Sequence, residues 1–215
     1  MDDRLETARR RYEQAMFGGD LSVLPDADRA LDGVEADLAL ARGMIVHARF
    51  LDQRVADPAE LTLFERAADL YARLGDQRGE GEALFWVGIY HQVVAGDHEA
   101  ALPPLRRSYE LAGSVDDRLT RSYAVRHLGF ADLAAGDPVA ARAKLEESVE
   151  LRRRLGFGPG VAAGLVALAH LAADEGRRPD ASALLDEAAA VARACAADGV
   201  LRWIDQAREQ FGDDS

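Results

Sequence analysis

The chain has 215 residues, of which 48% are hydrophobic and only 7% aromatic, and its formal net charge is −12. This charge argues against a broad nucleic-acid surface, since such surfaces depend on Lys and Arg neutralising phosphates. A single cysteine, Cys195, excludes an internal disulfide and a cysteine metal cluster. The N-terminus is charged where a secretory signal needs an apolar core, and no stretch approaches the roughly 18 uninterrupted apolar residues of a membrane span. We therefore expect a cytoplasmic protein without membrane contacts.

The first 33 residues predict an irregular helical hairpin. Two helical stretches, about 3–16 and 20–31, flank Phe17-Gly18-Gly19. This hairpin is degenerate compared with the sequence that follows it. A short basic cluster, Arg9-Arg10-Arg11, is interpreted as a solvated helix face with acidic partners along the helix rather than as a nucleic-acid patch, and the same interpretation is given to Arg152-Arg153-Arg154.

From about residue 34 the sequence repeats every 40 residues. The turn glycines Gly96, Gly136 and Gly176 are each 40 apart, and Asp57, Asp97 and Asp137 follow one another at the same step. Four more columns share this step: Ala101/Ala141/Ala181, Leu105/Leu145/Leu185, Ser108/Ser148/Ala188 and Leu111/Leu151/Val191. A period between about 20 and 50 residues indicates stacked units, none of which buries its apolar face alone. We expect one solenoid over 1–215, with clear repeats over 34–196.

Residues 118–156 show how one repeat is built. A first helix is expected to end near Gly136, which can take a positive φ, and Asp137 to accept the free amides of a second helix. Pro138 then falls in the first turn, where its missing N–H costs nothing. The second helix continues on one face at spacings of 4, 3 and 3, with Ala141, Leu145, Ser148 and Leu151. Each repeat is therefore predicted to be a helix, a turn and a second helix.

Two segments depart from this pattern. Pro103-Pro104 stand inside an expected second helix, where proline removes a hydrogen bond and clashes with the preceding turn. That helix is predicted either to begin late, near Pro103, or to be sharply kinked. At the C-terminal end, an amphipathic helix over 199–211 is expected to cap the stack, because solenoids need a polar outer face at their ends; it carries Val200, Ile204, Ala207 and Phe211.

These residues resemble the tetratricopeptide repeat (TPR) family. The resemblance is carried by Leu128-Gly129 in the first helix, Gly136-Asp137 in the turn and the small and apolar columns of the second helix. The closest version is the repeat of about 40 residues that is common in bacterial regulators. The resemblance implies an all-α fold, a TPR-like right-handed superhelix of about five antiparallel helix pairs with a C-terminal capping helix.

In such superhelices the first helix of each repeat lines a concave face, and the resemblance implies that contacts come from set positions along it. Counting back from the turn glycine gives Val46 and Phe50, Trp86 and Tyr90, Arg126 and Phe130, and Val166 and His170, with Tyr123 and His127 beside them. The candidate partner-binding residues are Phe50, Trp86, Tyr90, Tyr123, Arg126, Phe130 and His170. In this hypothesis the rings pack against apolar groups and Arg126 binds a carboxylate or phosphate. The alternative is that these side chains fill the space between helices or are covered by the C-terminal helix with Trp203.

No catalytic, metal or cofactor site is expected. The five histidines form no i, i+4 pair and no HExxH motif. The sequence also has no P-loop, no GxSxG motif and no dinucleotide-binding fingerprint. We therefore expect a non-enzymatic scaffold or adaptor that binds a protein or peptide. The alternative is a sensor domain for a small apolar or aromatic ligand that acts through a separate partner, and a homodimer is a third possibility.

Overall fold

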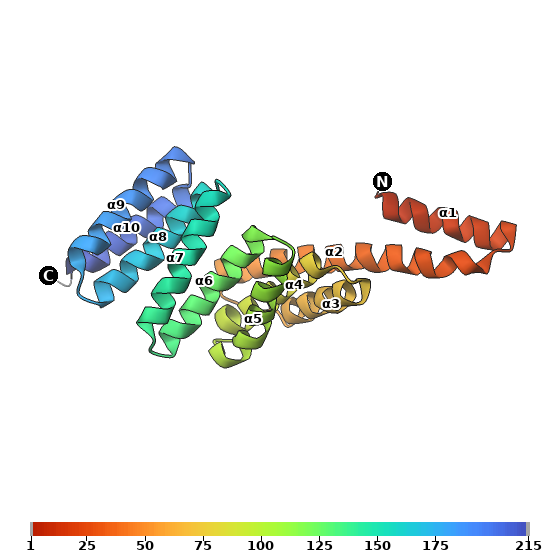
Figure 1. Cartoon of the computed structure of the whole chain (residues 1–215), viewed down its shortest axis with the longest axis horizontal. Coiled ribbons are helices and arrows are strands. Elements are labelled where there is room, and N and C mark those ends of the chain that lie inside the picture. Colours follow the sequence, from red (N-terminus) through yellow and green to blue (C-terminus); the bar gives the residue numbers. More distant parts are fainter. Residues whose placement is uncertain (1, 214–215) are drawn as a thin grey trace. The chain divides into compact units, whose positions relative to one another are not determined.

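A computed structural model describes residues 2–213, and over this range the chain is built of helices without any strand (Figure 1). The expected all-α class is confirmed. Ten α-helices and two short irregular helical segments occur in the described range: α1 (Asp3–Gly18), η1 (Leu21–Val23), α2 (Leu24–Gln53), α3 (Ala59–Leu74), α4 (Gln77–Ile89), η2 (Tyr90–Val94), α5 (His98–Ser114), α6 (Arg118–Ala134), α7 (Pro138–Arg154), α8 (Gly158–Asp174), α9 (Arg178–Ala194) and α10 (Asp198–Asp213). None of these helices is both long enough and apolar enough to span a membrane.

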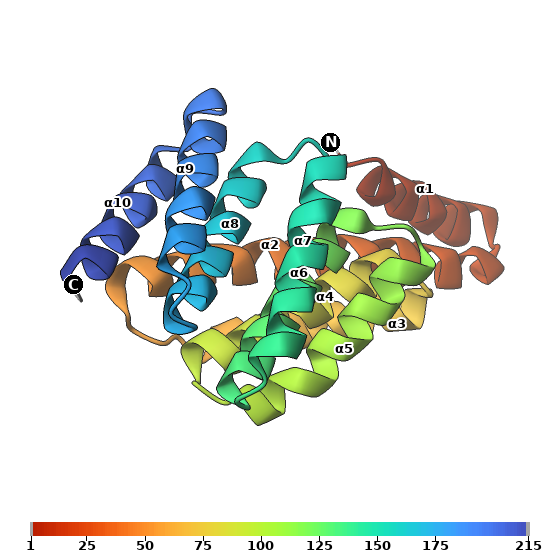
Figure 2. The same ribbon diagram turned by 60° about the vertical axis from the view of Figure 1, so that its left-hand side comes forward.

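The helices form two compact units, residues 1–115 and 116–215. In the first unit each helix from α1 to α5 packs on the next one along the chain. In the second unit α6 to α10 do the same, and α10 also packs on α8. Figure 2 shows α8, α9 and α10 side by side in the second unit. Successive neighbouring pairs are the packing that a helical repeat requires, because each apolar face is buried by the next helix.

The turn between α6 and α7 forms as the sequence predicts. Gly136 has a φ of 81°, in the left-handed region that favours glycine. The Asp137 carboxylate accepts a hydrogen bond from the Ala140 amide at 2.9 Å, so it caps α7. In the adjoining helices, a Cβ added to Gly129 would lie 3.2 Å from the Ala141 carbonyl oxygen, which shows how closely α6 and α7 approach.

The serine column of the repeat has a structural cause. The Ser148 hydroxyl of α7 donates to the Ser122 carbonyl oxygen of α6 at 2.7 Å. One repeat earlier, the Ser108 hydroxyl of α5 donates to the Gly81 carbonyl oxygen of α4 at 2.6 Å. Both hydroxyls are buried, so each needs a partner, and each finds it on the first helix of its own pair. The column thus ties the two helices of a repeat together.

The N-terminal segment differs from the expectation. The helix expected over 20–31 is instead the η1 turn followed by α2, which runs without a break from Leu24 to Gln53. Gly33 lies inside this helix, where glycine costs only about 1 kcal/mol relative to alanine. The boundary expected between 33 and 34 therefore lies within α2, and the N-terminal hairpin and the first repeat share one helix.

Pro103 and Pro104 lie inside α5, which begins at His98, so the predicted late start near Pro103 is wrong. The helix starts early because the Asp97 carboxylate caps it, accepting from the Ala100 amide at 2.9 Å. At the C-terminal end, the expected amphipathic helix is present as α10. Its buried side chains, Val200, Ile204 and Ala207, join the apolar core of the second unit.

A candidate ligand pocket in the second unit

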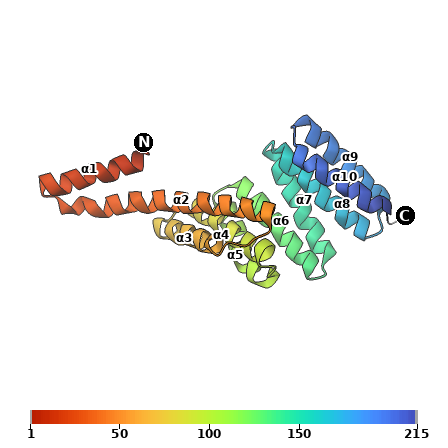
Figure 3. The ribbon, with the colours of Figure 1, turned by 180° about the vertical axis from the view of Figure 1, so that it is seen from behind.

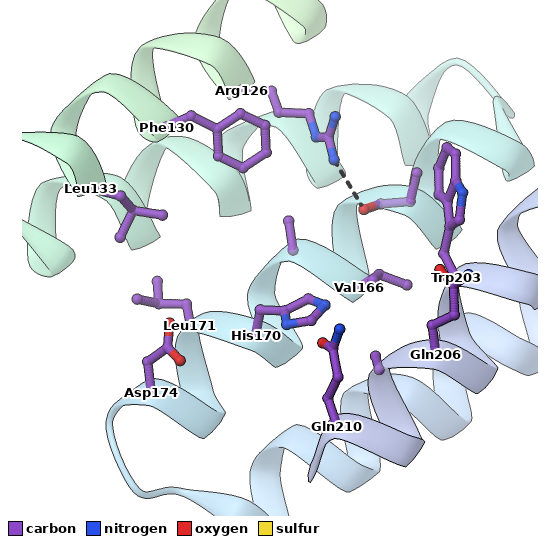
Figure 4. A pocket seen from close by; sticks show the side chains of 13 residues that line it. Arg126, Phe130, Leu133, Val166, His170, Leu171, Asp174, Trp203, Gln206 and Gln210 are labelled. Atoms are coloured by element: carbon purple, nitrogen blue, oxygen red, sulfur yellow. Dashed lines mark hydrogen bonds between the residues drawn. The ribbon is translucent and has the colours of Figure 1, made fainter. Parts of the chain in front are cut away.

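Three of the candidate residues predicted from the sequence line one pocket in the second unit (Figure 4). The pocket has a volume of about 420 Å³ and lies among α6, α8 and α10. Its lining residues are Arg126, Phe130 and Leu133 of α6, Ala163, Val166, Ala167, His170, Leu171 and Asp174 of α8, and Trp203, Gln206, Ala207 and Gln210 of α10. The pocket is therefore mostly apolar, with charged and amide groups at separate points of its wall.

Arg126 is the most unusual group in this wall. Its Nε atom is buried and has no hydrogen-bond partner. One Nη atom donates to the Ala163 carbonyl oxygen at 3.4 Å, a long hydrogen bond, and the guanidinium lies 4.7 Å from the centre of the Phe130 ring. Among residues 2–213 it forms no ion pair with a carboxylate. The pocket thus contains a cation whose hydrogen-bonding capacity is only partly used.

Burial and a second arginine both act on this cation. Desolvation, and then the positive charge of Arg152, lower the pKa of Arg126 to about 10. At neutral pH the guanidinium therefore still carries its charge, at a cost in free energy that an acidic partner would reduce. An anion entering the pocket next to Arg126 would supply the paired negative charge that this guanidinium lacks among residues 2–213.

Arg152 was not expected at this site. It is 1% exposed, although its cluster was interpreted as a solvated face, so for this residue the interpretation is wrong. Its Nε donates to the Ser122 hydroxyl at 3.3 Å, one Nη donates to the Gly160 carbonyl oxygen at 3.0 Å, and its guanidinium lies 4.9 Å from the centre of the Tyr123 ring. Burial lowers its pKa. Arg152 does not line the pocket, but its charge raises the positive potential at Arg126.

The remaining members of the cluster are exposed as expected, although only Arg154 has its acidic partner on the same helix. Arg153 forms an ion pair with Glu187 at 2.6 Å, and Arg154 forms one with Glu150, four residues earlier, at 2.8 Å. The 40-residue period carries the signal for Arg152, because the matching positions are Ala112 and Ala192, both buried. An arginine in a column of buried alanines indicates a buried cation.

Aromatic contacts hold the other candidate residues of this unit. The His170 ring meets Phe211 of α10 edge to face, with the ring centres 5.2 Å apart, so the C-terminal helix forms one wall of the pocket. Phe130 meets His127 in the same way at 5.4 Å. Tyr123 contacts Phe157 and lies under Arg152, outside the pocket lining. Trp203, by contrast, is 52% exposed at the pocket edge.

Figure 4 shows Arg126 and Asp174 at opposite sides of this pocket, with the amides of Gln206 and Gln210 on the α10 side. The pocket therefore offers a cation at one end, an exposed carboxylate at the other and amide groups along one edge. Sequence reasoning missed the contribution of α10 other than Trp203, because an amphipathic pattern tells which face of a helix is buried but not which neighbour it meets.

The candidate residues of the first unit lie in a different kind of environment. Trp86 stacks on Phe64, with the ring centres 5.5 Å apart, and meets His47 edge to face at 5.4 Å. Phe50 is buried beside His47 and under the guanidinium of Arg54. Tyr90 is half-buried at the start of the π-helical turn η2. In this unit the alternative interpretation, rings filling the space between helices, describes Trp86 and Phe50.

A buried pair of ionisable groups also lies in the first unit. His47 Nδ1 is 2.8 Å from Glu60 Oε1, and Glu60 is 0% exposed, with its second oxygen unpartnered. The pair links α2 to α3 beside Trp86. No group of three or more His, Cys, Asp or Glu side chains among residues 2–213 has the spacing to hold a metal ion.

No protein-family model matches the chain, and no curated protein is similar to it in sequence. The geometry of the pocket is therefore the main indication of what the chain binds.

Proposed function

We propose that the chain is a non-catalytic binding module, a TPR-like stack of helix pairs that holds a segment of a protein partner in the pocket of the second unit. The observation that carries this proposal is the buried, unpaired guanidinium of Arg126 in the pocket wall. Leaving a buried charge without a partner is costly, and such groups concentrate at functional sites. The preferred guest is a carboxylate, held by the two-pronged hydrogen bonding that arginine provides.

The rest of the wall suits an apolar or aromatic side chain next to that carboxylate. Phe130, Val166 and Leu171 offer apolar surface, and a volume of about 420 Å³ lies in the range of ordinary ligand pockets. The C-terminal residue of a peptide has both features, a free carboxylate and a side chain close to it. Binding a chain end in this way would leave the preceding residues of the peptide outside the pocket.

The exposed edge of α10 supports a peptide over an isolated small molecule. Gln206 and Gln210 carry amides that can both donate to and accept from a peptide backbone, and exposed Trp203 is of the residue type that dominates many binding interfaces. The second candidate function, a sensor for a small aromatic acid, is favoured by the pocket volume. The TPR-like assignment itself is supported by the 40-residue period together with the successive pairing of helices.

The test is a titration of the full chain with tetrapeptides that end in Phe, Leu or Trp, each made with a free C-terminal carboxylate and as the amide. We expect the free acids to bind and the amides to bind at least about tenfold more weakly, since a charge-assisted hydrogen bond contributes about 1.5 to 3 kcal/mol. Arg126→Gln should remove this preference. Arg193→Gln, which changes an exposed arginine of the same unit, is the matched control.

Each other outcome decides between the hypotheses. Binding of 3-phenylpropionate, but of none of the peptides, would favour the small-ligand sensor. If Arg126→Gln and the control bound the free acids equally well, the pocket assignment would be wrong. Circular dichroism of both variants shows that any loss of binding does not come from unfolding.

A further inference from the structure

The long helix α2 of the first unit is apolar on two opposite faces. One face packs on its neighbours, with buried residues that include Ala36, Leu40, Gly43 and Phe50. The other face bears large apolar side chains that remain exposed: Leu31, Leu38 at 48% and Ile45 at 58%. Figure 3 shows α2 lying along α3 in this unit. An apolar face that the described fold leaves uncovered indicates an interaction surface.

The exposed face has the spacing of a coiled-coil seam. Leu31, Leu38 and Ile45 are seven residues apart, and an apolar residue follows each of them after three positions: Val34, Ala41 and Ala48. Alternating steps of three and four residues place these side chains in one stripe along the helix. The stripe covers 18 residues, or about 27 Å at a rise of 1.5 Å per residue. We call these six residues the α2 seam.

Charged residues follow the seam in a pattern that changes sign half-way. Asp28 and Glu35 flank its N-terminal half, and Arg42 and Arg49 flank its C-terminal half, all four at the same heptad position. Within residues 2–213, Asp28, Arg42 and Arg49 have no ion-pair partner, and Glu35 is paired with Arg66 at 2.8 Å. A helix with this arrangement is complementary to a copy of itself that runs in the opposite direction.

The apolar and the charged residues specify the same antiparallel register. If Leu38 faces Ala41 of a second copy, then Val34 faces Ile45, and Leu31 faces Ala48. In an antiparallel coil equivalent flanking positions meet, so this register sets Asp28 against Arg49 and Glu35 against Arg42. A large side chain meets a small one in two of these three layers, which lets the two helices approach closely. A parallel pair in register would instead place Arg49 beside Met44 and leave it without an acid.

We propose that two copies of this chain associate through the α2 seam, as an antiparallel two-fold coiled coil held together by reciprocal Asp28–Arg49 and Glu35–Arg42 ion pairs. A closed two-fold arrangement uses the same patch on both copies, which is the commonest symmetry of soluble oligomers. The pairing also buries the exposed leucine and isoleucine side chains away from water. It is independent of the pocket, which lies in the other unit.

The first test is the mass of the wild-type chain in solution, measured by size-exclusion chromatography with light scattering over a dilution series. We expect twice the chain mass of 23.3 kDa. In the proposed dimer the Leu38 side chain of each copy is buried. Leu38→Glu should therefore weaken association about a hundredfold or more and give the single-chain mass. Val139→Glu is the matched control, because Val139 is 78% exposed and lies in the other unit.

Two results overturn the proposal at this step. One is a single-chain mass for the wild type at the highest concentration, which would leave the seam to a different protein or to solvent. The other is a dimer that Leu38→Glu does not weaken, since that dimer would use another surface. Should Leu38→Glu prove unfolded by circular dichroism, Arg42→Glu provides the same test, because Arg42 is exposed and forms no ion pair with a carboxylate in the part of the chain that the structure describes.

The second test determines the direction of pairing by cross-linking. In a Cys195→Ser background, a mixture of Leu31→Cys and Ala48→Cys chains should form a disulfide between the two kinds of chain, whereas Leu31→Cys alone should not. A cross-link of Leu31→Cys with itself would show a parallel pair and contradict the proposed register. Exchanging the charges within one chain, Glu35→Arg with Arg42→Glu, should restore the dimer that Arg42→Glu alone weakens. Failure of that rescue would contradict the ion-pair assignment.

Discussion

The two units place different side chains at the same position of the repeat. Trp86 and Arg126 are 40 residues apart, and each lies on the first helix of its pair. Trp86 is surrounded by the rings of Phe64, His47 and Phe85. Arg126 has one ring beside it, one long hydrogen bond and a pocket. Position in the repeat therefore selects residues that face inward, but it does not separate packing from binding.

The two positions differ in two respects: whether neighbouring groups satisfy the side chain, and whether a ligand can reach it. The first unit also contains an unpartnered atom, Glu60 Oε2, but this carboxyl is 0% exposed and its other oxygen is paired with His47. In the second unit an unpartnered buried atom, Arg126 Nε, belongs to a cation that lines a pocket. Substitutions in the two units should therefore have different effects.

Trp86→Ala should destabilise the chain by about 3 kcal/mol, because removing a packed aromatic ring leaves a cavity between α2, α3 and α4. The matched control is Trp203→Ala, which removes the same side chain from an exposed position and should change the free energy of unfolding by less than about 1 kcal/mol. Urea denaturation followed by circular dichroism measures both. Equal effects of the two substitutions would show that Trp86 is not a packing residue, and the contrast between the units would fail.

Arg126→Met should stabilise the ligand-free chain by about 1 to 3 kcal/mol, the opposite of the usual effect of a core substitution. The pKa of Arg126 in the folded chain is about 10, well below the ordinary value of an arginine, and each unit by which the pKa is lowered corresponds to about 1.4 kcal/mol, which sets the upper end of this range. Because the folded-state pKa is lowered, the penalty is fully present below pH 10 and fades as the pH rises towards the unfolded value. At pH 7 the whole effect is therefore available to measurement.

In the wild type and the Arg126→Met variant, stability and ligand binding should change in opposite directions. Chemical denaturation at pH 7 should show the Arg126→Met variant to be the more stable one, while a free-acid peptide should stabilise only the wild type. A variant that is less stable than the wild type without ligand would mean that Arg126 has a supporting role in the fold. In that case its unpaired guanidinium would no longer indicate a binding site.

The sequence predicts the local structure of this chain well because the determinants are local. Gly136 and Asp137 specify where one helix stops and the next begins, and the columns of small residues indicate which faces pack together. The exception in α2 has a physical reason. No residue of the 20–33 segment after Pro25 breaks a helix, and a single glycine is too weak a signal to do so.

The site could be predicted only in part. The repeat register selected Arg126, Phe130 and His170, which share the pocket, but it gave the same weight to Trp86 and Phe50, which are packed among other rings. Whether an inward side chain is covered depends on the size of the residues opposite it, on a different helix, and no periodicity in the sequence records that relation. The pocket wall formed by α10 could not be predicted for the same reason, because it arises from the packing of α10 on α8.

Ala167→Phe should weaken ligand binding by about tenfold or more and leave the fold intact. Ala167 is half-buried in the pocket wall, so a ring attached there occupies the space of the guest instead of displacing core side chains. Ala134→Phe, at an exposed position near the end of α6, is the control. Peptide titration reports the affinity and thermal unfolding reports the fold. Unchanged affinity would place the bound peptide elsewhere on the chain.

The smallest effect is expected from the exposed arginine at the end of the same basic cluster that contains Arg152. Arg154 pairs with Glu150, but the two side chains are 62% and 51% exposed, so water screens the interaction. Arg154→Ala should cost no more than about 0.5 kcal/mol, and this difference should vanish at high salt, because added ions screen exposed pairs. Denaturant titrations at low and high ionic strength measure it. A larger cost that persists in high salt would mean that Arg154, like Arg152, makes buried contacts, so that burial would extend over two consecutive arginines of α7.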